Sequence, residues 1–164
     1  MMVLRRWLFD HGDNLAGGIY GTILVTSIIA ATDFHANIWR SLAIVIVTTV
    51  TFWLAHVYAH ALAVSLDASE TICFARIRRV GRYERPLLQA AILPSLILLA
   101  GALGLVGTML TYRLAVGVGV ATLIWWGVVF ARKEQLSRRA TFVVVAVNAA
   151  FGILIVALKE FVSH

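Results

Sequence analysis

The sequence predicts an all-α, polytopic membrane protein with five transmembrane helices. Hydrophobic residues make up 61% of the 164-residue chain and charged residues only 13%, and the mean hydropathy is +0.90. A soluble domain of this size needs more polar surface than such a composition provides. A helix spans the bilayer with about 20 apolar residues. Five segments of comparable length contain no Asp, Glu, Lys or Arg: 14–32, 41–66, 87–112, 114–131 and 140–158.

The charged residues between these segments set the predicted helix ends. Residues 14–32 follow Asp10 and Asp13, which separate them from the basic N-terminus, so this helix is interpreted as a retained anchor and not a cleaved signal peptide. The second helix, 41–66, lies between Arg40 and Asp67.

The third predicted helix, 87–112, follows Arg85-Pro86, and proline suits the first turn of a helix. Pro94 predicts a kink within it, because proline lacks an N–H and crowds the preceding turn. The link Thr111–Arg113 is expected to join it to the fourth helix, 114–131. The last helix, 140–158, is uncharged throughout.

Lys and Arg are distributed unequally between the loops. With five spans, one side of the membrane carries eleven of them and the other side three. Cytoplasmic loops carry the excess of basic residues, so the N-terminus is predicted inside and the C-terminus outside. Residues 67–86 then form a basic cytoplasmic loop, too short for a core of its own.

The net charge of +6 is therefore attributed to topology and to anionic headgroups, and no nucleic-acid partner is expected. The predominance of Arg over Lys, with abundant Ala, Val and Gly, suggests a GC-rich bacterial genome and hence the bacterial cytoplasmic membrane. The predicted partners are the lipid bilayer and further copies of the chain.

Small residues follow one side of the first helix. Gly17 and Gly21 have the small-xxx-small spacing that lets helix backbones approach closely. Gly18, Thr22 and Thr26 form a small, weakly polar face, because residues four apart share one side of a helix. This face is expected either to pack against protein or to line a solute pathway.

The third helix has a comparable strip at Gly101, Gly104 and Gly107. Both strips favour close packing and self-association into a homo-oligomer. Trp125 and Trp126 are expected at the membrane interface, where amphipathic rings concentrate.

Two histidines stand in the apolar run of the second helix. His56 and His60 lie one turn apart, and Trp53 precedes His56 by three residues, so the three share a face. Ionisable residues within a span face protein or a water-filled cavity. We expect His56, with Trp53, to be a brace between the second and first helices, with Thr22 or a backbone carbonyl as its partner. His60 is expected to be the wetter and less consequential neighbour.

Four roles for the histidine pair remain open: metal binding, haem ligation, a pH-sensitive role and structural hydrogen bonding. Zinc needs three or four ligands, and the spans contain no Cys, Asp or Glu. Haem needs axial ligands from opposite sides, which one helical face does not supply. Neither a metal nor any other cofactor is therefore predicted. A pH-sensitive role remains, since histidine titrates near physiological pH, and no catalytic residues or enzyme motif are recognised.

The stretches GGIYGT at 17–22 and FWLAH at 52–56 resemble those of small integral membrane proteins of actinobacteria. More distantly, Phe52-Trp53 before His56, with Pro94 in the third helix, is similar to the prokaryotic relatives of the endolysosomal potassium channels. Ala16-Gly17-Gly18 stands where that family has Phe-Ser-Asp, and that family has one helix more per repeat. The resemblance implies a homo-oligomeric cation pathway lined by the first helix and braced by Trp53 and His56.

The leading functional hypothesis is a channel or transporter for a small ion, built as a homo-oligomer. The alternative is a non-transporting membrane subunit or a scaffold for a partner protein. The face of Gly18, Thr22 and Thr26 distinguishes them, because a pathway exposes it to water and a scaffold packs it against protein.

Overall fold

The computed structural model describes residues 15–32, 37–68 and 74–162. Within these ranges the chain forms six α-helices and no strand, which confirms the predicted all-α class. The helices are α2 (Leu15–Ala31), α3 (Ile38–Ala68), α4 (Phe74–Tyr83), α5 (Arg85–Ala102), α6 (Thr108–Lys133) and α7 (Arg138–Val162). By length and composition, α3, α5, α6 and α7 could each cross a membrane, and α2 is a shorter apolar helix of 17 residues.

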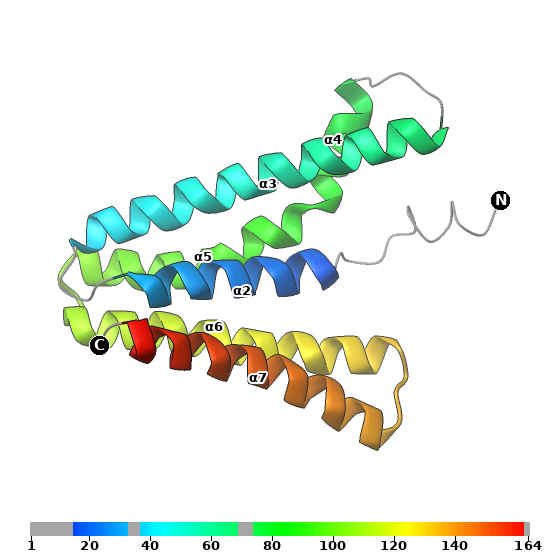
Figure 1. The fold of residues 1–164 in the computed structure, drawn as a ribbon. Coiled ribbons are helices and arrows are strands. Elements are labelled where there is room, and N and C mark those ends of the chain that lie inside the picture. The colour runs from blue at the N-terminus through cyan, green and yellow to red at the C-terminus, as the bar shows by residue number, and fades with distance from the viewer. Residues whose placement is uncertain (1–14, 33–36, 69–73, 163–164) are drawn as a thin grey trace.

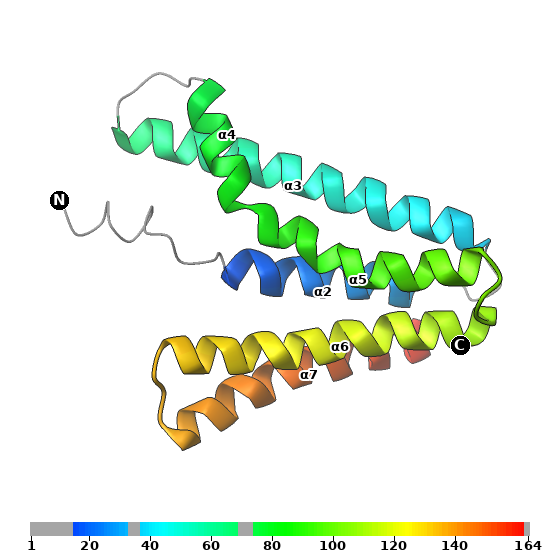
Figure 2. The ribbon, with the colours of Figure 1, turned by 180° about the vertical axis from the view of Figure 1, so that it is seen from behind.

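The five apolar helices, α2, α3, α5, α6 and α7, run along a common direction, and α2 lies between the others (Figure 1). It packs against α5 and α6, and also contacts α3 and α7. Figure 2 shows α3 with α4 at one edge and the α6–α7 pair at the other. The start of α2 and the end of α7 lie at opposite ends of the bundle.

The largest buried cluster joins α2, α3, α5 and α6. Val25 and Ile29 of α2 pack there with Val45 of α3, Leu98 of α5 and Tyr112 of α6. A smaller cluster joins α2, α6 and α7 through Ala30, Leu123 and Ile155. The central helix therefore contributes to both clusters, which explains how a short apolar helix is held.

The predicted link at Thr111–Arg113 is wrong. The structure ends α5 at Ala102, and the turn contains Gly104 with φ of +76°. Glycine adopts this left-handed conformation without strain and commonly ends a helix. Apolar residues Leu103, Leu105 and Val106 occupy the turn, so the absence of charge does not mark its position.

The correction moves several predicted residues. Thr111 and Tyr112 are fully buried within α6, and the Tyr112 hydroxyl lies 2.6 Å from Ser41 Oγ of α3. Gly104 and Gly107 belong to the turn and have open space around them, so they form no packing strip. Gly101 alone packs tightly, against Thr111.

The predicted loop 67–86 also needs correction, because its residues 74–83 form α4 and Arg85 begins α5. The α4 helix packs on α3 and runs across the bundle direction (Figures 1 and 2). Residues 69–73, between the end of α3 at Ala68 and the start of α4 at Phe74, lie outside the described structure.

Candidate functional site

His60 is held at the junction of α4 and α5. Its Nδ1 lies 2.9 Å from Glu84 Oε1, and its ring meets the Tyr83 ring edge-on, with centroids 5.6 Å apart. Glu84 is only 4% exposed. The imidazole Nδ1 donates this hydrogen bond when the carboxylate is ionised, because an ionised carboxylate only accepts. Two consecutive residues of the junction thereby fix one imidazole of α3.

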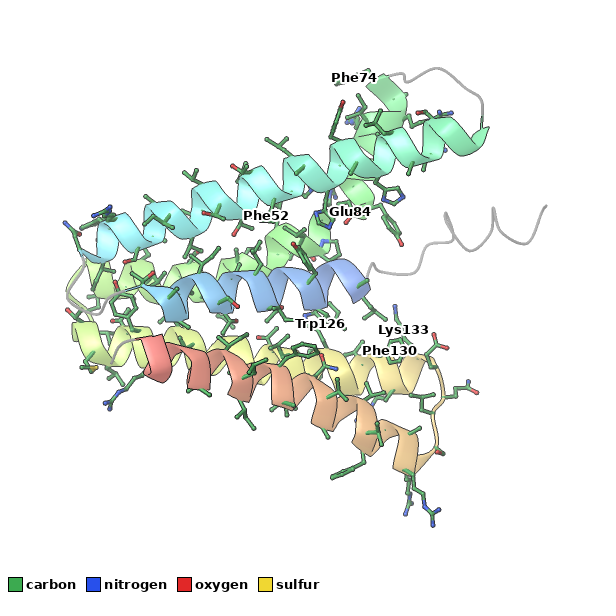
Figure 3. The ribbon with its side chains drawn as sticks, viewed as in Figure 1. Phe52, Phe74, Glu84, Trp126, Phe130 and Lys133 are labelled. Atoms are coloured by element: carbon green, nitrogen blue, oxygen red, sulfur yellow. The ribbon has the colours of Figure 1, made fainter. Side chains whose placement is uncertain are left out.

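Glu84 occupies the position before the first turn of α5 but makes no side-chain cap. Pro86 in that turn needs no hydrogen-bond acceptor for its nitrogen. The carboxylate is turned instead toward His60. Figure 3 shows Glu84 beside α3, on the opposite side of α2 from Trp126.

His56 faces α2 by ring contact. Its ring centroid lies 5.0 Å from that of Tyr20, and Phe52 contacts the same tyrosine at 6.5 Å. Tyr20 is 40% exposed, so these rings lie toward the outside of the bundle. The predicted partner Thr22 is bonded elsewhere, since its hydroxyl donates to the Gly18 carbonyl.

Trp53 packs toward α4 and not toward α2. A Cβ added to Gly81 of α4 would lie 3.3 Å from the Trp53 ring, so the glycine makes room for the indole. Trp53 Nε1 is buried and has no hydrogen-bond partner in the part of the chain that the structure describes. The three residues predicted to act together thus contact different elements: Trp53 meets α4, His56 meets α2 and His60 meets the α4–α5 junction.

The face of Gly18, Thr22 and Thr26 is buried against α6. The Thr22 and Thr26 hydroxyls donate to carbonyl oxygens four residues earlier, each at 2.7 Å. A Cβ on Gly18 would lie 2.6 Å from the Trp126 ring. Thr26 is covered in the same way by Gly119 of α6. Within the chain this face contacts protein.

Gly21 serves internal packing as well, because a Cβ there would lie 2.7 Å from the Leu87 carbonyl oxygen of α5. Trp126 was expected at the interface, yet it packs on Gly18, while Trp125 is 60% exposed. Asn148 of α7 donates to the Val144 carbonyl of its own helix at 3.0 Å. These polar and small residues bring the helices of one chain together.

Glu84 was not predicted as a partner of the histidines, because it lies outside the uncharged segments that form the predicted helices. The available signal was a carboxylate at a predicted helix start, directly before Arg85-Pro86, where a preceding segment can fold back on the bundle. Ser41 and Tyr112 were missed because Tyr112 was assigned to a link. In the described ranges, no three His, Cys, Asp or Glu residues are grouped so that they could hold a metal ion.

Comparisons of the chain with protein-family models, with curated proteins and with solved structures found no match. The resemblance to relatives of potassium channels therefore stays a prediction from the residues quoted for it. Function has to be argued from the geometry of this chain alone.

Proposed function

We propose that all five apolar helices are inserted in a bacterial cytoplasmic membrane, with the N-terminus inside and the C-terminus outside. At 1.5 Å per residue, the 17 residues of α2 extend about 26 Å, near the lower limit for a span. Its central place in the bundle supports insertion together with its neighbours. The basic α4 and the α6–α7 turn lie at one end of the bundle, which supports the same orientation.

Within this membrane we propose a non-transporting subunit that assembles with further copies of itself. The observation that carries the non-transporting role is the burial of Gly18, Thr22 and Thr26 against α6, whereas self-assembly is proposed from the sequence alone. This is the weakly polar face predicted either to pack against protein or to line a pathway, and its hydroxyls are bonded to their own helix. Protein contact at this face favours the scaffold over the pathway.

A small-ion pathway remains the second candidate, and one observation favours it. Glu84, which is buried, is hydrogen-bonded to the partly buried His60 at the end of the bundle. Ionisable residues buried in membrane proteins commonly mark proton or ion routes. A pathway at this pair would use the α3–α4–α5 side of the bundle and not the α2 face.

Flux and assembly measurements on the purified full-length chain test both candidates. Liposomes containing it should pass potassium, sodium, protons and chloride no faster than empty liposomes, with a known ionophore as the positive control. Native mass spectrometry in mild detergent should show an oligomer. Flux of any one ion that Glu84→Gln reduces would overturn the subunit proposal in favour of the pathway, and a purely monomeric protein would contradict the assembly.

A further inference from the structure

The α4 helix has one apolar side and one basic side. Arg78, Arg79 and Arg82 are exposed, and Arg82 follows Arg78 by four residues and Arg79 by three, so the three share one side. Ile77 lies on the other side, together with Val80 and Gly81, which are buried against α3, and Phe74 lies where the two sides meet, one turn before both Ile77 and Arg78. The fold covers only the end of the apolar side nearest the bundle, because Phe74 is 80% and Ile77 39% exposed.

The position of α4 places this exposed apolar side at the border of the membrane. The helix ends at Tyr83, and α5, which is long and apolar enough to cross a membrane, begins at Arg85. α4 runs across the bundle direction (Figures 1 and 2), so it lies approximately in the membrane plane when the bundle spans the bilayer. Figure 3 shows Phe74 at the end of α4 that points away from the bundle.

The positive charges of Arg78, Arg79 and Arg82 are available to an external anion. Among the described residues, no carboxylate forms an ion pair with Arg78, Arg79 or Arg82. The adjacent carboxylate, Glu84, is buried and bonded to His60. Basic amphipathic helices with exposed aromatic or aliphatic residues lie in the interface of anionic membranes.

We propose that α4 is an interfacial helix that binds anionic phospholipid. The headgroup phosphates contact Arg78, Arg79 and Arg82, and Phe74 and Ile77 insert between the acyl chains beneath them. This inference rests on the membrane insertion proposed above, but it does not depend on whether the chain transports ions.

The test compares lipid retention by three full-length proteins: wild type, the triple variant Arg78→Gln/Arg79→Gln/Arg82→Gln, and a control. The control Arg132→Gln/Arg138→Gln/Arg139→Gln removes the same charge from exposed positions at the α6–α7 turn. Each is purified from mixed phosphatidylglycerol and phosphatidylcholine, and the retained lipids are counted by native mass spectrometry. We expect the ratio of retained phosphatidylglycerol to retained phosphatidylcholine to be roughly tenfold lower for the α4 variant than for wild type. The control should keep the wild-type ratio. Equal losses in both triple variants, or no preference in wild type, would overturn the proposal.

A depth measurement tests the apolar side separately. The single cysteine of the chain is first removed by Cys73→Ser. Nitroxide labels are then placed at Ile77→Cys in one protein and at Arg79→Cys in another, each in vesicles of the same lipids. The Ile77 label should collide mainly with oxygen and the Arg79 label with a water-soluble nickel chelate. Two labels equally accessible to nickel would overturn the interfacial position. Resistance of the triple variant to carbonate extraction shows that insertion persists, so loss of lipid preference is distinguished from failed insertion.

Discussion

Glu84 is a buried carboxylate that is hydrogen-bonded to an imidazole of α3. His60 contacts both Glu84 and Tyr83, whereas in the described structure His56 makes a ring contact with Tyr20. Removing one partner of a buried hydrogen bond leaves the other poorly solvated. We therefore expect the energetic order of the two histidines to be the reverse of the order predicted from the sequence.

We predict that His60→Ala lowers the free energy of unfolding by about 1–3 kcal/mol, and that His56→Ala lowers it less. His60→Gln is the matched control, because its amide can still donate a hydrogen bond to the carboxylate. Thermal unfolding of the purified variants in mild detergent measures the difference. An equal or larger effect of His56→Ala would show that the ring contact with Tyr20 matters more than the bond to Glu84.

The spacing of these histidines was readable from the sequence, but their partners were not. Residues 56 and 60 share a face in any helix. The partner of His60 stands 24 residues away, on a segment whose return to the bundle depends on how α4 packs against Trp53 and Val57. A periodicity argument has no access to such a contact.

For the individual helices, too, the sequence predicts some features and not others. Runs without charge located the apolar helices, because charge is costly in the hydrocarbon region. They failed between α5 and α6, where the turn itself is apolar and Gly104 ends the helix through its backbone conformation. Arg113 does not mark a boundary, because it is exposed on α6 within two turns of the helix start, where a long side chain can extend toward the interface.

Contact between α2 and α6 supplies the prediction at this scale. A Cβ at Gly119 would overlap the Thr26 hydroxyl, and it would lie 2.9 Å from Thr26 Cγ2. Gly119→Ala should therefore destabilise the protein by about 1–3 kcal/mol through overpacking. Gly117→Ala is the control on the same helix, since a Cβ there meets nothing within 4 Å.

Adding Thr26→Ala to Gly119→Ala should restore part of the lost stability, because the two changes act on one contact. Thermal unfolding of the single and double variants measures this coupling. If Gly117→Ala and Gly119→Ala were equally destabilised, the effect would come from helix propensity or lipid contact and not from the α2–α6 approach.

At the scale of the whole molecule, the short length of α2 allows two topologies, one in which α2 crosses the membrane and one in which it does not. If α2 spans the membrane, the basic α4 and the α6–α7 turn lie inside, and the two ends of the chain lie on opposite sides. If only α3, α5, α6 and α7 span it, the basic segments still lie inside, but both ends lie outside. The position of the C-terminus alone therefore does not separate the two arrangements.

We predict a cytoplasmic N-terminus and an external C-terminus. Reporter fusions after Arg79 and after His164, which lies outside the described residues, should report opposite sides of the membrane. The deciding measurement is a single cysteine, Val3→Cys, in a chain with Cys73→Ser. It should react with a membrane-impermeant maleimide only after the cells are lysed, because the central position of α2 and the basic residues Arg5 and Arg6 both favour an inside N-terminus. Labelling in intact cells would mean that α2 is packed within the bundle without crossing the membrane, and a cytoplasmic report from both fusions would contradict either topology.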